Sequence, residues 1–405
     1  MTPEIKQRIE QIRRREVPEG YVKKRKVVIP QQWGLPQIKD IASISSGSTP
    51  NRNNSEYWNG NIAWVTTGEL SSGHVNHTSE LITVKAVKET KMRIYPQGTL
   101  LMAMYGQGKT RGTVAILEID AAVNQACAAI TVKVGKSKFL FYQLKNSYQD
   151  IRKLSNTGNQ ENLNADIIKT YQVPWAPDEE QERISTILTT QDRVIELKEK
   201  RLAEKQRQKK YLMQQLLTGK KRLPGFIGKW KTFGFNEIFI TISTKGHQIN
   251  KAEYETKGRY PVIDQGRQMI AGYSNKAEKA LMCPKEGVIV FGDHTREIKF
   301  VNFNFIVGAD GTQLLSAKSK NAAIKYLFYY LSNKDIHSDG YSRHFKYVKE
   351  FTYRLPPLGE QTAIAEVLSA ADHEIDLLQQ DIEQEKQKKK ALMQLLLTGI
   401  VRVKT

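Results

Sequence analysis

The sequence has few cysteines and no long hydrophobic run. Among its 405 residues there are two cysteines, Cys127 and Cys283, which lie far apart and form no CxxC pair. This pattern argues against a thiolate metal site and favours a reducing compartment, with a buried structural role for both thiols. No apolar stretch approaches the roughly 18 residues of a membrane span. The N-terminus, with three arginines at residues 13–15, has no apolar core of a signal peptide. We therefore expect a cytoplasmic protein without a membrane partner.

Signatures of nucleotide and methyl-transfer chemistry are also missing. Residues 103–110 match a loosened Walker A pattern in which Ala103 replaces the first glycine. The alternating TVAILEI run that follows predicts a strand, whereas a phosphate-binding loop must lead into a helix. Measurable ATP binding that depends on Lys109 would revive an enzymatic interpretation. We find no methyltransferase motif and no glycine-rich cofactor loop, so the sequence predicts no cofactor on this chain.

Two clusters of potential metal ligands are weak. His74 and His77 form an HxxH pair with no third ligand in sequence reach, which favours a structural or surface role. Asp293, Glu297 and Lys299 superficially resemble the carboxylates and lysine of nucleases, at a spacing that arises often by chance in a charged chain. The sequence therefore predicts neither a catalytic residue nor a metal site.

Positive charge is in excess and is unevenly distributed. The net charge is +20 and the pI is near 9.6. Residues 180–219 hold nine Lys/Arg against six Asp/Glu, and residues 360–399 hold four against eight, so the two stretches together carry −1 and the other segments +21. A polyanionic partner such as nucleic acid is expected to bind those other segments. The alternative is a solvated basic surface without a ligand.

The two stretches are copies of one sequence. They align without a gap at an offset of 180, with 16 identities in 40 positions. Both lack internal Pro and Gly and are rich in good helix formers, which predicts helices of about 40 residues, or roughly 60 Å. Asp178 and Gln181 match a capping box at the first start. Gly219 and Gly399 stand where a C-terminal cap needs a left-handed residue.

Apolar residues recur every seven positions in both predicted helices, and polar residues interrupt the seam. The rows are Leu188, Ile195, Leu202 and Leu216 in the first helix and Leu368, Ile375, Ile382 and Leu396 in the second. Gln191, Lys198 and Lys205 interrupt the first seam. If an approximate two-fold axis relates the copies, the coiled-coil-like helices run antiparallel and act as a spacer between globular segments. The alternative is a helix pair that merely packs on a core.

The two globular segments share a plan. Each begins with a basic stretch, a Pro-Gly-aromatic turn and a tryptophan, Trp33 or Trp230. Short predicted strands follow, such as TLLMAM and TVAILEI in the first segment and YPVI and GVIVFG in the second. An aromatic helix (KFLFYQL or KYLFYYL), a polar loop and a final strand complete each segment. Residues 2–15 predict a short helix that is similar to the helical repeat.

Several runs carry a resemblance to a known family. SISSGSTP and YWNGNIAWVTTGELS (Ser43 to Ser71), TLLMAMYGQGKTRG (Thr99 to Gly112), NQAC, YPVIDQG and LLTGKKRLPGF resemble the specificity subunit of Type I restriction-modification enzymes, over nearly the whole chain. The resemblance implies a non-catalytic subunit of bacterial or archaeal origin that reads a bipartite, asymmetric DNA sequence. It implies an α+β fold, with two mixed α/β target-recognition domains separated by two antiparallel long helices in a pseudo-two-fold repeat.

The resemblance and the sequence together predict partners and domain limits. The expected partners are double-stranded DNA, modification (methyltransferase) subunits, two in number, and restriction (endonuclease/translocase) subunits. S-adenosylmethionine, ATP and Mg are expected on the partner subunits only. The predicted segments are a helical and basic lead-in (1–29), the first recognition domain (30–177), the central helix (178–219), the second domain (220–356), and the distal helix with its tail (357–405). A coiled-coil scaffold that binds proteins and no DNA is the alternative.

Polar and basic loops are the candidate DNA-binding sites, because Gln, Asn and Arg can bond base edges and Lys can reach phosphates. For each residue, a turn position that meets only solvent or phosphate is the alternative. The candidates in the first domain are Arg52, Asn53, Tyr105, Gln107, Lys109, Thr110, Arg111, Asn159 and Gln160. The candidates in the second domain are Gln265, Arg267, His294, Arg296, Arg343 and Lys346.

Overall fold

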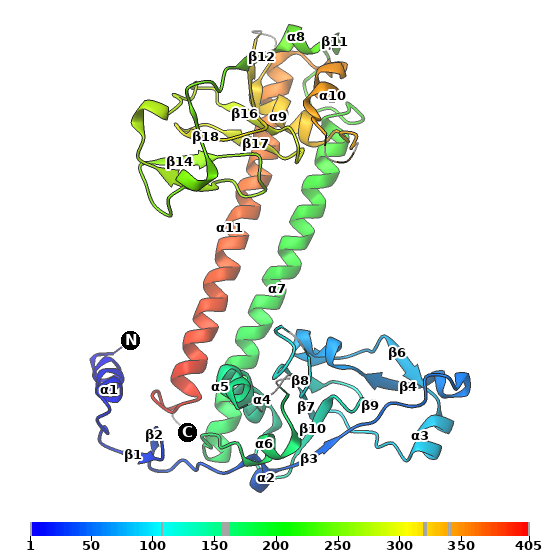
Figure 1. Ribbon diagram of the computed structural model, residues 1–405, viewed down its shortest axis with the longest axis vertical. Coiled ribbons are helices and arrows are strands. Elements are labelled where there is room, and N and C mark those ends of the chain that lie inside the picture. The colour runs from blue at the N-terminus through cyan, green and yellow to red at the C-terminus, as the bar shows by residue number, and fades with distance from the viewer. Residues whose placement is uncertain are drawn as a thin grey trace. The chain divides into compact units, whose positions relative to one another are not determined.

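The chain divides into two compact units in a computed structural model (Figure 1). The structure describes residues 2–106, 108–154, 162–318, 322–338, 340 and 342–403. Unit 1 comprises Met1–Leu197 and Ile382–Thr405, and unit 2 comprises Lys198–Asp381. Each unit therefore contains one globular domain and half of each long helix. Within the described ranges, no helix combines the length and the apolarity needed to cross a bilayer.

The two long helices lie where the repeat predicts them and end three residues before the capping glycines. Helix α7 is Asp178–Leu216 and helix α11 is Leu358–Leu396, so each has 39 residues and both ends are offset by 180. Gly219 and Gly399 follow them at φ of 73° and 72°, which confirms the left-handed caps. The capping box at Asp178 is wrong. The Gln181 amide instead donates to the Ala176 carbonyl oxygen and accepts from the Lys136 backbone N–H.

Within each unit the halves of the long helices run antiparallel. In unit 1, the Glu180 carboxylate at the start of α7 accepts bonds from Arg402, just beyond the end of α11, and further along α7 the Gln191 amide donates to the Glu385 carboxylate at 2.6 Å. Asp192 pairs with Lys389. The polar residues that interrupt the predicted seam thus have partners on the opposite helix, as a buried or half-buried polar group requires.

Unit 2 repeats this arrangement with the other helix halves. Lys198 bonds Asp381 at 2.8 Å, and Lys205 bonds Glu374 at 2.9 Å. Apolar seam residues of α11 in this unit, such as Leu368 and Ile375, are buried. The antiparallel, coiled-coil-like prediction is confirmed within each unit.

The domain of unit 1 combines two sheets with short helices. Its helices are α1 (Pro3–Arg13), α2 (Ile38–Ile41), α3 (Val84–Thr90), α4 (Ser137–Asn146), α5 (Tyr148–Lys153) and α6 (Ala165–Thr170). Its strands are β1 (Tyr21–Lys24), β2 (Val27–Pro30), β3 (Ala42–Ser46), β4 (Trp58–Val65), β5 (His74–Val75), β6 (Glu80–Ile82), β7 (Leu100–Ala103), β8 (Val114–Leu117), β9 (Ala121–Val123) and β10 (Cys127–Val132). One sheet has the order β3-β10-β7-β8-β5 and the other β6-β4-β9, beside a β1-β2 hairpin.

The domain of unit 2 has a similar set of elements. Its helices are α8 (Phe235–Ile238), α9 (Ile324–Ser332) and α10 (Phe345–Glu350). Its strands are β11 (Lys231–Phe233), β12 (Phe239–Ile242), β13 (Gln248–Ile249), β14 (Tyr260–Ile263), β15 (Gly272–Ser274), β16 (Val288–Gly292), β17 (Ile298–Val301), β18 (Ile306–Gly308), β19 (Thr312–Ala317) and β20 (Tyr353–Leu355). The sheets have the orders β12-β19-β16-β17 and β13-β18-β14-β15, and β11 pairs with β20.

The two domains therefore share one topology. The order β3-β10-β7-β8 in unit 1 corresponds to β12-β19-β16-β17 in unit 2, and β6-β4-β9 corresponds to β15-β14-β18. The central pairings β10-β7 in unit 1 and β19-β16 in unit 2 are antiparallel, and β4-β9 and β14-β18 are parallel. The internal repeat thus includes the domains as well as the helices, which confirms the fold predicted from the sequence.

The aromatic helix of each domain attaches it to the long helices in the same way. In unit 1, the Tyr142 hydroxyl on α4 donates to the Asp192 carboxylate on α7 at 2.8 Å. In unit 2, the Tyr329 hydroxyl on α9 donates to Asp372 on α11 at 2.6 Å. Asp192 and Asp372 occupy equivalent positions of the repeat. Each domain core is therefore continuous with the long-helix core of its own unit.

Two smaller expectations need correction. Cys127 is fully buried, as expected, but Cys283 is only half-buried. The final strand expected in both domains forms as β20 in unit 2, whereas unit 1 has isolated bridges at Gly34 and Gln37 with residues 175 and 172. In unit 2, β20 pairs with β11 over three residues.

Candidate nucleic-acid interface

In unit 1, the candidates Tyr105, Lys109, Thr110 and Arg111 lie in the long turn between β7 and β8. Gly106, Gly108 and Gly112 have φ of 128°, 62° and 82°, so glycine supplies the left-handed positions of this turn. Tyr105 and Lys109 are exposed and Thr110 is half-buried. Because β8 follows the turn, the helix that a Walker loop needs is not formed, which supports the decoy interpretation of residues 103–110.

Helix α5 holds this turn in place. The Tyr148 hydroxyl donates to the Lys109 carbonyl oxygen at 2.6 Å, and Arg152 donates to the Arg111 carbonyl oxygen at 2.8 Å. The Arg111 side chain is 7% exposed, so it does not present its guanidinium at the surface as Lys109 presents its ammonium. Lys109 and Arg111, both candidates from the sequence, therefore differ in solvent exposure, and Arg111 is placed to support the turn.

A second loop of unit 1 contains Arg52 and Asn53, both exposed. The Arg52 guanidinium lies 4.0 Å from the centroid of the Trp58 ring and pairs with both carboxylate oxygens of Glu80. The hydrogen bonds that Arg52 donates to Glu80 raise the pKa of Arg52 and lower the pKa of Glu80. Arg52 is thus held over the Trp58 ring and stays charged at the surface, an arrangement suited to bidentate contact once the carboxylate is exchanged for another acceptor.

The loops of unit 1 meet along one edge of the larger sheet. Thr49, in the loop of Arg52, bonds the side chain of Gln125, and the Met104 N–H at the start of the β7–β8 turn donates to the Ala126 carbonyl oxygen. This edge is formed where β3 and β7 end and β8 and β10 begin. Of the candidates in this domain, Gln107, Asn159 and Gln160 lie outside the described residues.

In unit 2, the turn between β16 and β17 occupies the same place. Gly292 N–H donates to the Glu297 carbonyl oxygen, as Ala103 N–H does to Thr113 in unit 1. Arg296 has a φ of 62° at the position of Gly112, and its guanidinium donates to the Ile336 carbonyl oxygen at 2.9 Å. The topology therefore places this turn at the edge that corresponds to the edge in unit 1.

Three other candidates of unit 2 join this turn. The His294 N–H donates to the Gln265 side-chain oxygen at 3.2 Å, and the Thr295 hydroxyl donates to the Gln265 backbone oxygen at 2.5 Å. Arg267, in the same loop as Gln265, has a side chain that is 93% exposed and lies 3.5 Å from Glu297. Gln265, Arg267, His294 and Arg296 therefore form one polar surface.

Asp293 binds the backbone of the segment that contains Arg343 and Lys346. The buried Asp293 carboxylate accepts the Phe345 N–H at 2.8 Å, and its backbone oxygen accepts the His344 N–H at 2.8 Å. Arg343 and Lys346, on either side of these bonds, are exposed. Lys346 lies in α10, whereas the sequence predicted a loop there. Asp293 thus positions the start of α10, which explains its burial without a nuclease role.

Sequence reasoning did not assign several residues that support or extend these surfaces, and it named Lys299 only for its nuclease-like spacing. Lys299 is buried and donates to the Asp264 and Gln268 carbonyl oxygens, and its burial lowers its pKa. Thr295 and Gln125 were also missed, because only the tertiary structure brings them beside Gln265 and Thr49. His74 lies 2.8 Å from Glu118. Among the described residues, no three His, Cys, Asp or Glu side chains form a group that could hold a metal ion.

Comparison with known proteins identifies the family. The profile of the Type I restriction modification DNA specificity domain matches residues 30–206 and 227–387. The chain belongs to this family. Both matched segments contain one domain with part of a long helix, so the Type I specificity domain occurs twice, in agreement with the shared topology of the units. Family membership gives the chain a role in DNA sequence specificity.

Individual members of the family are similar to this chain in sequence or in fold. The type I restriction enzyme MjaIX specificity subunit of Methanocaldococcus jannaschii is 34% identical over 178 residues, which cover 42% of this chain and 40% of that subunit. The MjaVIII specificity subunit of the same organism is 22% identical over 93% of this chain and 94% of its own length. The S subunit of a type I system from M. genitalium has a similar fold, with a TM-score of 0.64, 15% identity, and coverage of 90% of this chain and 96% of that one.

Proposed function

We propose that this chain reads a bipartite, asymmetric DNA sequence, one half with each domain, and directs methylation and restriction by partner subunits. The observation that carries the proposal is the pair of equivalent sheet edges. Each edge presents polar and basic side chains, and the side chains differ between the units: Arg52 and Lys109 in one, Gln265 and His294 in the other. Equivalent frames with different side chains suit the reading of two different half-sites.

The long helices favour a partner present in two copies. Leu197 on α7 and Leu377 on α11 occupy equivalent positions of the repeat, and each side chain is 50% exposed. A surface that occurs twice in one chain can bind the same subunit twice, and an exposed leucine in a charged helix is suited to a protein contact. We infer that two methyltransferase subunits bind there. They and the restriction subunits would hold S-adenosylmethionine, ATP and Mg, while this chain acts in the cytoplasm without a catalytic residue of its own.

The test is to express the chain with the methyltransferase subunit encoded beside it and to map methylated adenines across the genome. The expected result is one split, asymmetric motif. Replacing residues 30–177 with the same segment of a relative should then change one half of that motif and leave the other unchanged. A change in both halves, or in neither, would refute the division of reading between the domains.

The scaffold alternative makes a different prediction. A DNA-reading chain should bind duplex DNA with an affinity that falls steeply with salt, because phosphate contacts release counterions. A protein-binding scaffold with a basic surface would lose all polyanion affinity at modest salt and would show no preferred sequence. Competition between specific and unrelated duplexes at about 150 mM salt separates the two.

A further inference from the structure

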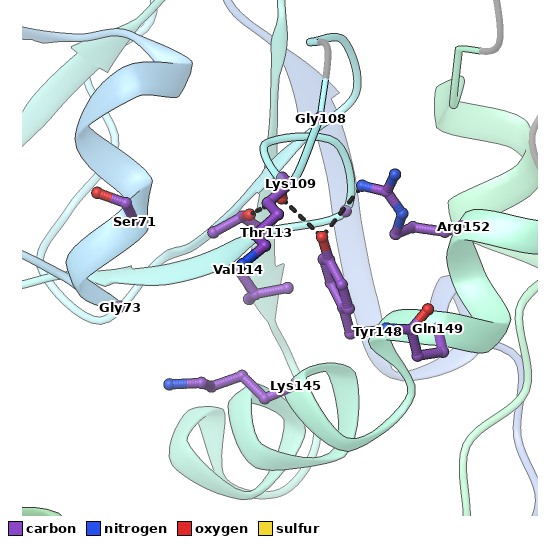
Figure 2. Close-up of a pocket in the computed structure, with 11 residues that line it drawn as sticks. Ser71, Gly73, Gly108, Lys109, Thr113, Val114, Lys145, Tyr148, Gln149 and Arg152 are labelled. Atoms are coloured by element: carbon purple, nitrogen blue, oxygen red, sulfur yellow. Dashed lines mark hydrogen bonds between the residues drawn. The ribbon is translucent and has the colours of Figure 1, made fainter. Parts of the chain in front are cut away.

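Unit 1 contains a cavity of about 440 Å³ beneath the β7–β8 turn. Its walls come from the end of the turn at Gly108–Val114, from α4 and α5, and from Ser71 and Gly73 on the opposite side (Figure 2). The volume falls in the range of about 300 to 1,000 Å³ of pockets that hold organic ligands. It therefore has room for more than a single ion, such as a phosphate with part of its sugars.

The charges around this cavity are of one sign. Lys109, Lys145 and Arg152 line it, and none of the lining residues that the structure describes is acidic. Hydroxyl and amide groups of Ser71, Thr113 and Gln149 complete the polar lining. The ammonium groups of Lys109 and Lys145 repel one another, and a bound anion would offset that repulsion. The lining thus fits an anionic ligand with several oxygen acceptors.

Lys145 lines this cavity from α4. Its ammonium nitrogen lies 4.9 Å from the centroid of the Phe141 ring and within 3.2 Å of where a Cβ on Gly73 would stand. Within the described part of the chain, no hydrogen-bond acceptor or carboxylate pairs with this ammonium. Burial lowers the pKa of Lys145, and the charge of Lys389 lowers it further against an opposing effect of Asp192. A bound anion would restore the charge that burial disfavours.

The cavity lies next to the β7–β8 turn, which favours an anion that belongs to the DNA. The Tyr148 hydroxyl and the Arg152 guanidinium donate to the backbone oxygens of Lys109 and Arg111. Gly108 and Lys109 lie on the turn that forms the rim of the cavity (Figure 2). A ligand in the cavity would thus touch the turn that the proposed function assigns to DNA. Phosphate contacts make up about half to two-thirds of protein–DNA hydrogen bonds.

We propose that this cavity binds a backbone phosphate of the DNA duplex, with Lys145 as its principal cation. This inference rests on the proposed function and extends it, because it assigns the anchoring of the β7–β8 turn on DNA to a site below the base-reading surface. Unit 2 has Ser332 at the position of Lys145 in the aromatic helix, by alignment of α9 with α4. The phosphate site is therefore specific to the half-site that unit 1 reads.

The experiment uses the full chain in complex with its methyltransferase subunit and a duplex that contains the methylated motif. Binding is measured at several salt concentrations for the wild type, Lys145→Gln and Lys138→Gln. Lys138 lies on the same helix and is exposed outside the cavity, so the control removes the same charge. We expect Lys145→Gln to weaken binding about tenfold and to reduce the salt slope by about 0.9, while Lys138→Gln leaves the slope unchanged.

Further variants and a second ligand make the result unambiguous. Lys145→Arg should retain the slope, and Lys109→Gln tests the same cavity from its rim if Lys145→Gln fails to fold. Equal slopes for Lys145→Gln, Lys109→Gln and the wild type would overturn the proposal while leaving sequence-specific binding intact. Thermal stabilisation by inorganic phosphate that depends on Lys145, with no change in the DNA slope, would mean a free anion and would also overturn it. If the wild-type complex bound all DNA sequences equally well, the proposed function itself would be refuted.

Discussion

Arg402 and Arg222 bind buried glutamates at the starts of α7 and α11. Replacing each arginine with alanine should destabilise the two units to different extents. In unit 1, the carboxylate of Glu180, which has no exposed surface, accepts two bonds of 2.8 Å from Arg402 and one of 2.9 Å from the Trp33 indole N–H. In unit 2, the equally buried Glu360 accepts bonds of 2.9 and 2.5 Å from Arg222. The indole of Trp230, equivalent to Trp33, has no hydrogen-bond partner in the described structure.

The expected magnitudes follow from these contacts. Breaking a buried ion pair by removing one partner costs about 3 to 5 kcal/mol, and we take about 3 kcal/mol for Arg222→Ala because that side chain is 28% exposed and water can replace part of it. For Arg402→Ala we expect about 2 kcal/mol, since the Trp33 indole still donates to Glu180 and one retained hydrogen bond is worth about 1 kcal/mol.

Hydrogen exchange at the helix starts measures each unit separately, which a single melting temperature of a two-unit chain does not. Amides near Glu180 should exchange about 30-fold faster in Arg402→Ala, and amides near Glu360 about 150-fold faster in Arg222→Ala. Adding Glu180→Gln or Glu360→Gln to the matching arginine variant should recover part of the loss. Equal effects of the two arginine variants, or no recovery by the glutamines, would refute the reasoning.

Three other outcomes are expected. Tyr142→Phe and Tyr329→Phe should each destabilise their own unit by about 1.5 to 3 kcal/mol, as loss of a hydrogen bond to a carboxylate does; equal exchange rates in variant and wild type would contradict this. Arg296→Gly should be less destabilising than Arg296→Ala, because glycine adopts the φ of 62° without steric strain and unit 1 has Gly112 at the equivalent position. Denaturant unfolding measures the free energy of unfolding of both variants. Burial raises the pKa of Tyr254 to about 12. The resulting contribution of Tyr254 to the free energy of unfolding should be complete below about pH 10 and should be lost as the pH rises toward 12. Tyr254→Phe should therefore flatten the dependence of unfolding free energy on pH in this range.

The sequence predicted best the features that depend on local pattern. The bounds of α7 and α11 follow from composition, periodicity and the two capping glycines, and strands such as β16 follow from β-branched runs. These signals are repeated many times along each element, so single errors matter little.

The sequence predicted the candidate site less completely. Arg52 and Lys109 look alike as loop cations, but only the fold shows that Arg52 pairs with Glu80 and lies on Trp58. Arg111 was indistinguishable from them, although it is buried. Exposure and pairing depend on residues far away in the chain, which no local pattern encodes. The cavity around Lys145 was missed for the same reason.

The division of the long helices between the units has a consequence for synthesis on the ribosome. The core of unit 1 includes Leu396 and Leu397 together with Trp33 and Leu188, and the Gln143 amide donates to the Leu397 carbonyl oxygen. Unit 2, in contrast, is one continuous segment. Since chains emerge from the N-terminal side, the domain that is translated first must wait with an unfinished core until residues 382–403 have been made, and the domain translated second can complete its fold before it.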